Sequence, residues 1–264
     1  MTGKSYAHFP IRTGLETVRH RIAAAAEAAG RRPEDIRLIA VSKAFPAQAI
    51  HAAVACGQRA FGENYAQEAV DKIIALDALL SPADRKSPEN GSASVATAAC
   101  SAQPLAAALE WHFIGPVQSN KTKLVAEYFH WVQSLDRMKV AQRLADQRPA
   151  RLPPLQICIQ VNVSGEKTKG GVAPSALAEL AQQIALLPRL QLRGLMTIPA
   201  PSQGANELRR QFRLLRQLRD DLAVRGLVLD TLSMGMSDDL DVAIGEGATM
   251  VRVGRAIFGD RPAH

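Results

Sequence analysis

The stretch RLIAVSKAFPAQAI, residues 37–50, places a lysine directly after a run that is typical of a buried strand. Residues 37–42 are short, apolar and rich in β-branched side chains, and the segment that follows has helical periodicity, with Pro46 suited to the first helical turn. Lys43 is therefore expected at a strand-to-helix junction. In α/β proteins these junctions lie at the carboxyl ends of strands, where ligands bind. The competing interpretation is a lysine that extends from a loop into solvent.

The rest of the chain repeats this alternation of strand and helix. We predict eight strands, at residues 36–42, 59–62, 110–114, 130–135, 155–163, 191–198, 228–233 and 249–253. Helices are predicted at residues 13–30, 46–56, 64–80, 120–128, 136–147, 174–187, 204–224 and 238–245. Eight such units in about 230 residues fit a closed (β/α)8 TIM barrel better than an open doubly wound sheet. The first strand also lacks the GxGxxG of dinucleotide-binding folds.

Length and composition fit a single domain. The 264 residues, 47% of them hydrophobic, can bury a sizeable core. We expect one domain spanning 1–264, with a flexible insertion at 82–108, because residues 81–104 are rich in Ser, Pro, Ala and Gly and have no sustained apolar period.

The cysteines and the hydropathy pattern indicate a cytoplasmic protein. Cys56, Cys100 and Cys158 are odd in number and widely spaced, which argues against a disulfide framework or a zinc site. The first residues lack the apolar core of a secretory signal, and no run approaches the roughly 18 apolar residues of a membrane-spanning helix. We therefore expect neither a bound metal nor a membrane partner.

The basic charge does not by itself indicate a nucleic-acid partner. The net charge is +7, yet most basic residues are scattered among acidic ones. The densest stretch, residues 208–219, has Leu208, Phe212 and Leu215 on one helical face, so its arginines are expected on the solvated side of a packed helix. We therefore predict no nucleic-acid partner.

Two stretches near the end of the chain could bind an anion. Ser237 follows the predicted seventh strand and is a good N-cap, and the free amides of a helix N-terminus can bind anions. Gly254 ends the predicted eighth strand and allows close approach to a ligand. In TIM barrels the loops after strands seven and eight frequently bind phosphate. The alternative is an ordinary capped helix and glycine turn, which Asp238 and Asp239 favour because they repel a phosphate.

Strand alternation places polar side chains inside the barrel. In the eighth strand the valines at 251 and 253 should face the outer helices, which directs Arg252 inward, where a guanidinium needs a partner. An internal carboxylate, Glu63 or Asp241, is favoured over a ligand group. Asn64, after the second strand, should reach the same rim. A further polar line that could face the interior consists of Gln156, Cys158, Gln160 and Asn162.

Seven ordered stretches together resemble a known family. They are LIAVSKAFP, GQRAFGENYAQEAVDK, EWHFIGPVQSNK, VNVSGEKTKGG, LRGLMTIPAP, LSMGMSDDL and MVRVGRAIFG. In this order they resemble the YggS/PROSC family of pyridoxal 5′-phosphate (PLP) homeostasis proteins. The resemblance covers about residues 12–81 and 109–260.

The resemblance implies a fold-type III PLP barrel, similar to the N-terminal domain of alanine racemase, with PLP held as an imine on Lys43. It also implies that Ser237 and Gly254 contact the phosphate, that Asn64 lies near the ring and that Arg252 faces the pyridine nitrogen. For the histidine of the WHFIG stretch, His112, a packed core position is an equal alternative.

Two features depart from the family pattern. The first is the insertion at 82–108. The second is Arg255, which stands where the family usually has threonine. Arg255 could bind the phosphate through two hydrogen bonds. Alternatively, it could point outward, and the phosphate would then have one contact fewer than in the family pattern.

The residues also bear on catalysis. Imine formation needs a neutral amine, and partial burial at a barrel mouth should lower the pKa of Lys43 from its usual value of about 10.4. Arg252 cannot accept a hydrogen bond, so it would leave the pyridine nitrogen unprotonated and weaken carbanion stabilisation. We therefore assign no catalytic residue.

We expect a monomeric cytoplasmic protein that binds and carries or buffers PLP, with PLP-dependent apo-enzymes as possible recipients. The alternatives are a PLP-dependent racemase-like enzyme, a cofactor-free Schiff-base lyase and a nucleic-acid-binding protein.

Overall fold

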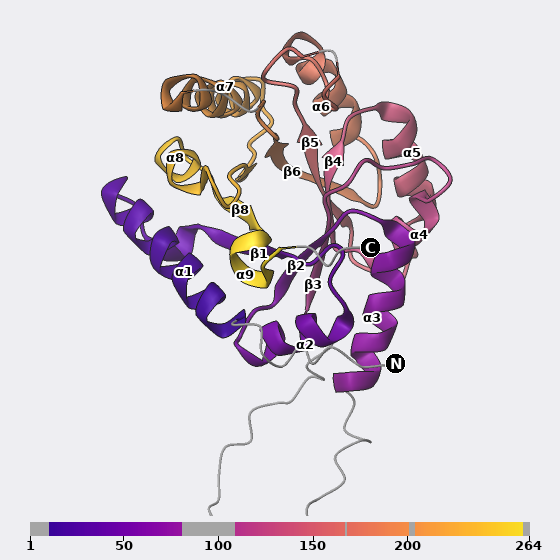
Figure 1. The fold of residues 1–264 in the computed structure, drawn as a ribbon. Helices are drawn as coiled ribbons and strands as arrows, with labels where there is room; N and C mark the ends of the chain where they lie inside the picture. Colours follow the sequence, from indigo (N-terminus) through magenta and orange to yellow (C-terminus); the bar gives the residue numbers. More distant parts are fainter. Residues whose placement is uncertain (1–10, 81–108, 167, 201–203, 261–264) are drawn as a thin grey trace, which may run out of the picture.

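The chain folds into a closed barrel of parallel strands surrounded by helices (Figure 1). This computed structural model describes residues 11–80, 109–166, 168–200 and 204–260. The strands pair in the order of the sequence, and β1 closes the barrel against β8. They are β1 (Arg37–Val41), β2 (Ala60–Glu63), β3 (Glu110–Phe113), β4 (Trp131–Leu135), β5 (Leu155–Gln160), β6 (Leu190–Met196), β7 (Thr231–Ser233) and β8 (Met250–Val253). The predicted (β/α)8 barrel is confirmed.

The helices follow the strands around the outside of the barrel. They are α1 (Ile11–Ala28), α2 (Ala47–Ala55), α3 (Ala66–Leu80), α4 (Thr122–Tyr128), α5 (Met138–Gln147), α6 (Leu177–Ala185), α7 (Ala205–Val224), α8 (Leu240–Gly245) and α9 (Arg255–Phe258). Short 3-10 turns lie at η2 (Pro33–Asp35) and η5 (Pro174–Ala176). The predicted insertion at 82–108 and Cys100 lie outside the described residues.

Some strand bounds differ from those predicted, and one short helix was missed. The fifth strand was expected to reach residue 163, but β5 ends at Gln160 because the backbone there turns to pair with Val172. The seventh strand begins only at Thr231. Residues after Gly254 form the short helix α9, which the sequence did not predict and which ends at Gly259 with a positive φ of 83°.

The core has two layers, one inside the barrel and one between strands and helices. The inner cluster consists of Ile39, Ala60, Trp131, Cys158, Met196 and Met250. On β8, Val251 and Val253 belong to the outer layer, which confirms that Arg252 faces the interior. On β5, Cys158 faces inward, and alternation places Gln156 and Gln160 on the same side.

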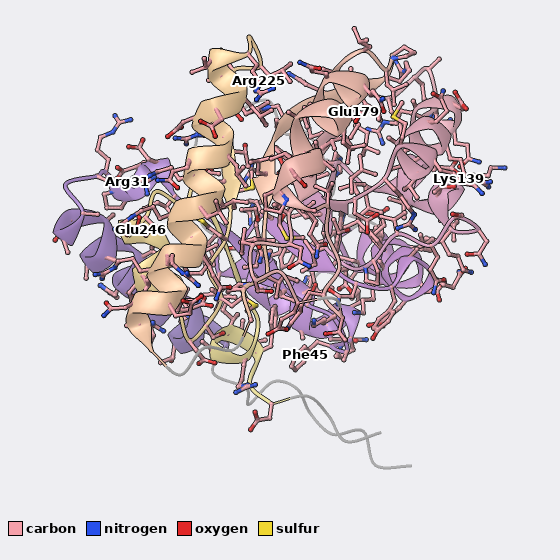
Figure 2. The ribbon with its side chains drawn as sticks, turned by 90° about the horizontal axis from the view of Figure 1, so that it is seen from above. Arg31, Phe45, Lys139, Glu179, Arg225 and Glu246 are labelled. Carbon is pink, nitrogen blue, oxygen red and sulfur yellow. The ribbon has the colours of Figure 1, made fainter. Side chains whose placement is uncertain are left out.

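Helix α7 runs along the outside of the barrel (Figure 2). Two of its own residues, Phe212 and Leu215, are fully buried in the core. Its exposed arginines pair with acids, and Arg213 lies 3.0 Å from an oxygen of Glu246. The expected packed helix with a solvated basic face is confirmed. Within the described ranges, no helix combines the length and the apolar character needed to cross a membrane.

Candidate functional site

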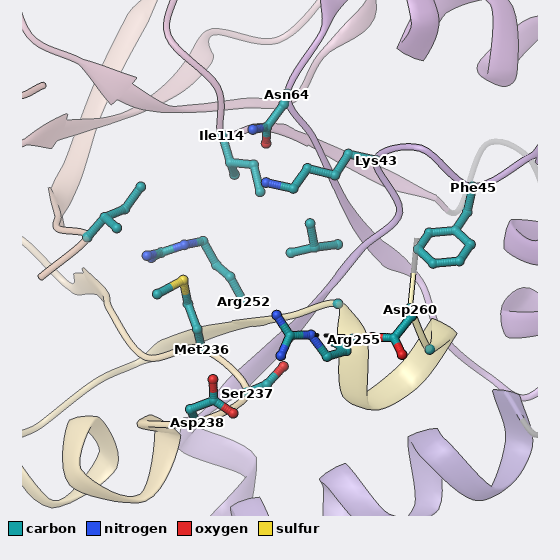
Figure 3. Close-up of a pocket in the computed structure, with 14 residues that line it drawn as sticks. Lys43, Phe45, Asn64, Ile114, Met236, Ser237, Asp238, Arg252, Arg255 and Asp260 are labelled. Carbon is teal, nitrogen blue, oxygen red and sulfur yellow. Dashed lines mark ion pairs between the residues drawn. The ribbon is translucent and has the colours of Figure 1, made fainter. Parts of the chain in front are cut away.

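A cavity of about 560 Å³ opens at the carboxyl ends of the strands (Figure 3). This volume suits a small organic ligand. Its lining includes all six predicted site residues, Lys43, Asn64, Ser237, Arg252, Gly254 and Arg255. The structure therefore brings together side chains that are up to 212 residues apart in the sequence, since 255 minus 43 is 212.

Lys43 lies in the tight turn that follows β1. The amide of Phe45 donates to the carbonyl of Ser42 at 3.0 Å, which closes the turn around the lysine. Figure 3 shows the half-buried side chain reaching into the cavity beside Ile114, with Arg252 beyond its amine. The predicted strand-to-helix junction is confirmed, although Pro46 is the N-cap of α2 rather than part of its first turn.

Arg252 is buried inside the barrel and is held by neutral groups. Its Nη1 donates to Ser233 Oγ at 2.7 Å, and its Nη2 donates to the carbonyl oxygen of Thr197 at 2.8 Å. Burial lowers the pKa of Arg252 to about 10. Arg252 is also part of the cavity wall.

The carboxylates predicted to pair with Arg252 have other partners. Glu63 bonds to Lys72 and to the Ser42 hydroxyl, because strand alternation turns its side chain toward the helix layer. Asp241 lies on α8 and pairs with Arg21 of α1 outside the barrel. The predicted pairing with an internal carboxylate was therefore wrong.

A chain of polar contacts extends from Arg252 through the barrel interior. Ser233 Oγ donates to Gln133 Oε1 at 2.6 Å, and the Gln133 amide nitrogen lies 2.8 Å from His112 Nδ1. Since an amide nitrogen can only donate, His112 Nδ1 accepts and the ring proton belongs on Nε2, which lies 2.6 Å from Glu110 Oε1. Complete burial lowers the pKa of His112 and keeps its ring neutral.

His112 is a core histidine and not a cavity residue. Its ring stacks on Trp131 with centroids 5.4 Å apart, as the core alternative predicted. Sequence reasoning missed Gln133 and Ser233 as supports of Arg252. The alternation of side chains along a strand could have indicated both residues, because they stand at inward-facing positions of β4 and β7.

Ser237 lies in the loop after β7 but does not cap a helix. The N-cap of α8 is Asp239, whose carboxylate accepts a hydrogen bond from the amide of Met236. The Ser237 carbonyl instead accepts from Arg21 Nη1 at 2.8 Å. The predicted N-cap was wrong because the loop continues for two residues beyond Ser237. Asp239 is turned into its own loop, whereas Asp238 is exposed at the cavity edge.

Gly254 and Arg255 form the last turn of the site. A side chain at Gly254 would begin 3.2 Å from the carbonyl oxygen of Val41, so this glycine lets β8 approach β1 closely. The Arg255 side chain is 73% exposed, and its Nε lies 3.8 Å from Asp260 Oδ1. Figure 3 shows it projecting over the cavity beside Ser237. Arg255 therefore faces the site while remaining accessible to water.

Asn64 supplies an unused hydrogen-bond acceptor. Its buried Oδ1 accepts no hydrogen bond from the part of the chain that the structure describes. The backbone of Asn64 packs against Gly115, where an added Cβ would lie 2.2 Å from the Asn64 carbonyl oxygen. A buried polar atom of this kind is costly unless a partner is supplied, so its position fits a ligand with a hydrogen-bond donor.

Comparison with known proteins identifies the family. The family model described as alanine racemase, N-terminal domain, matches residues 14–262. The pyridoxal phosphate homeostasis protein of Pseudomonas aeruginosa is 50% identical over 251 residues, covering 95% of this chain and 96% of that protein. The chain belongs to the pyridoxal phosphate homeostasis protein family. The family member of Escherichia coli K12 is also 50% identical, over 252 residues that cover 94% of this chain and 95% of that one.

Solved structures agree with this assignment. PipY of Synechococcus elongatus, a structure with PLP bound, has a TM-score of 0.74 and 34% identity, covering 94% of this chain and all of that chain. Alanine racemase of Corynebacterium glutamicum has a TM-score of 0.61 at 16% identity, covering 94% of this chain and 62% of that chain, and shares the fold. The resemblance drawn from the sequence motifs is confirmed.

The hydroxyl of Ser233 is expected to stabilise the interior of this family member. Ser233→Ala leaves Gln133 Oε1 and Arg252 Nη1 without their mutual partner, so the free energy of unfolding should fall by about 1–3 kcal/mol. Urea denaturation measures this change. The matched control is Ser237→Ala, whose hydroxyl lines the open cavity and should leave unfolding within about 0.5 kcal/mol of the wild type. An equal loss in both variants would contradict the assigned role of Ser233.

Proposed function

We propose that this protein binds PLP through an imine on Lys43 and serves in PLP homeostasis as a carrier or buffer, without robust catalysis of its own. The observation that carries the proposal is the convergence of Lys43, Arg252 and Arg255 on one cavity. Named relatives at 50% identity are PLP homeostasis proteins, and PipY is a neighbour with PLP bound.

The cavity residues fit the parts of PLP. Lys43 and Asn64 lie on one side of the cavity and Ser237 and Arg255 on the opposite side, with Arg252 between them in the view of Figure 3. The Lys43 amine can condense with the aldehyde, and Asn64 Oδ1 can accept a hydrogen bond from a ring substituent. Ser237 and the Gly254 turn are assigned to the phosphate, as the family resemblance implies.

The position of Arg252 supports a carrier more than an enzyme. When bound, PLP supplies an electron-withdrawing ring, which is most effective if the pyridine nitrogen is protonated. The Arg252 guanidinium has only N–H donors, so it cannot hold a proton on that nitrogen. Its bonds to Ser233 and Thr197 keep it in place. Among the described residues that line the cavity, none is a tyrosine, histidine or cysteine that could serve as an opposing base.

Partners and location follow from the same proposal. A buffer must release its cofactor, so PLP-dependent apo-enzymes are the proposed recipients. A monomer in the cytoplasm, without a nucleic-acid or membrane partner, remains our prediction. The single domain at 1–264 is likewise a proposal, supported by the closure of one barrel through β8.

The first test is the site of covalent attachment. Purified protein mixed with PLP and reduced with borohydride should gain the mass of one reduced PLP adduct, because reduction traps an imine. Lys43→Ala should lose the adduct, whereas Lys139→Ala, which removes an exposed lysine of α5, should keep it. Intact-mass spectrometry measures all three. An undiminished single adduct in Lys43→Ala would refute the assignment.

The second test separates a carrier from an enzyme. With PLP bound, the protein should exchange the α-proton of alanine in deuterated water no faster than the same concentration of free PLP, because Arg252 weakens carbanion stabilisation. Proton NMR follows the loss of the α-proton signal. Exchange that exceeds free PLP and disappears in Lys43→Ala would favour the racemase-like alternative.

The third test concerns Arg255. Arg255→Ala should weaken PLP binding by roughly fivefold, which corresponds to the roughly 1 kcal/mol of an exposed charge contact. Binding of pyridoxal, which lacks the phosphate, should not change. Arg210→Ala on the solvated face of α7 is the control for loss of a positive charge. Titrations of absorbance measure both ligands, and equal effects on PLP and pyridoxal would place Arg255 outside the phosphate site.

A further inference from the structure

An ionic cluster of two buried side chains and one half-buried side chain lies directly behind the turn that carries Lys43. We call it the Lys72 cluster, and it consists of Lys72, Glu63 and Glu68. Lys72 Nζ lies 3.0 and 3.1 Å from the two carboxylate oxygens of Glu63 and 2.6 Å from Glu68 Oε1. Glu63 is fully buried and Lys72 is 8% exposed. Its members come from the end of β2 and from α3, and none of them lines the cavity.

The Lys72 cluster binds the residues on both sides of Lys43. On one side, Lys72 Nζ donates to the Ser42 carbonyl oxygen at 2.9 Å and the Ser42 hydroxyl donates to Glu63 Oε1 at 2.7 Å. On the other side, the amide of Ala44 donates to Glu68 Oε1 at 2.8 Å. The backbone before and after Lys43 is therefore attached to the same three side chains.

The backbone at Ala44 needs such support. Its φ is 67°, in the left-handed region that disfavours residues with a Cβ. Conformations of this kind persist where surrounding contacts over-determine them, and they gather at functional sites. The hydrogen bond from the Ala44 amide to Glu68 is a contact of this kind.

A purely structural role does not explain the composition of the cluster. The neighbouring buried residues of α3 are apolar, including Ala69, Val70, Ile73 and Leu76. A buried ion pair is often no more stabilising than well-packed apolar side chains of similar volume. What charged groups add here is directed hydrogen bonding to Ser42 and Ala44, on either side of the lysine.

We propose that the Lys72 cluster is a positioning device that fixes the 42–44 backbone so that the Lys43 amine meets the aldehyde of PLP. This rests on the proposed imine, in which the Lys43 nitrogen forms the C=N bond and the aldehyde oxygen leaves as water. Glu68 is the positioning residue most open to a test, because its removal leaves the Lys72–Glu63 pair intact.

The experiment compares Glu68→Ala with the wild type, using two ligands. PLP reports imine formation through its visible absorbance, and pyridoxine 5′-phosphate, which lacks the aldehyde, reports the ring and phosphate contacts alone. Glu68→Ala should lower the imine formation constant by about tenfold, because it removes a partly buried hydrogen bond to a charged group. The dissociation constant for pyridoxine 5′-phosphate should change by less than about twofold, since the cluster lies outside the cavity lining.

Two further variants make the test specific to the turn. Ala44→Gly added to Glu68→Ala should restore most of the imine formation, because glycine adopts a positive φ without steric cost. Glu68→Gln keeps an oxygen that can accept from the Ala44 amide, and it should form the imine within about threefold of the wild type. Asp71→Ala, which removes an exposed carboxylate of α3, is the matched control and should behave as the wild type.

The outcomes separate this inference from the proposed function. Unchanged imine formation in Glu68→Ala overturns the positioning role and leaves the carrier proposal standing. Equal losses for both ligands, not repaired by Ala44→Gly, also overturn it, because they indicate general damage to the fold. A wild-type protein without an adduct at Lys43 refutes the proposed function and the positioning role with it. If Glu68→Ala does not fold, Glu68→Asp takes its place, because its shorter side chain withdraws the carboxylate from the Ala44 amide. A lower imine formation constant with normal binding of pyridoxine 5′-phosphate then supports the role, and unchanged imine formation overturns it.

Discussion

The site depends on the pairing of the first strand with the last. β1 and β8 run parallel in a register that aligns Ile39 with Arg252 and Ala40 with Val253. This closure brings the turn after β1, which carries Lys43, beside the turn after β8, which carries Gly254 and Arg255. Because all strands point the same way, their carboxyl ends share one rim. A lysine from the start of the chain and an arginine from its end thus meet in one cavity.

The electrostatics of the cavity follow from how Arg252 is satisfied. A buried guanidinium is costly unless it is hydrogen-bonded. Here the Ser233 hydroxyl and the Thr197 carbonyl each accept one hydrogen bond from the guanidinium, and neither partner cancels its charge. The buried charge of Arg252 therefore gives the cavity wall a positive character that suits an anionic ligand. The nearby acids Asp238 and Asp260 are exposed, where water screens their charge.

The support of the site is built in layers that reach beyond the cavity. Behind Arg252, Ser233 and Gln133 extend the polar contacts to the neutral His112 in the barrel core. Behind Lys43, the buried ammonium of Lys72 and its two carboxylates hold the backbone of the turn. Both sets of contacts restrict the motion of a cavity residue through groups that do not line the cavity. Preorganisation of this kind reduces the entropy that binding must overcome.

The sequence by itself determined the barrel and six of the residues that line the cavity. Alternating strand and helix patterns are local signals, and strand parity alone was enough to turn Arg252 inward. The ordered motifs placed Lys43, Asn64, Ser237 and Gly254 at one rim.

Only the tertiary structure decided which groups pair, because a partner depends on where distant strands and helices lie. Glu63 looked available to Arg252, yet its side chain points to α3 and binds Lys72. The role of Ser237 depended on where the loop before α8 ends. The close approach of Gly254 to Val41 depended on the pairing of β8 with β1, which the order of residues along the chain does not specify.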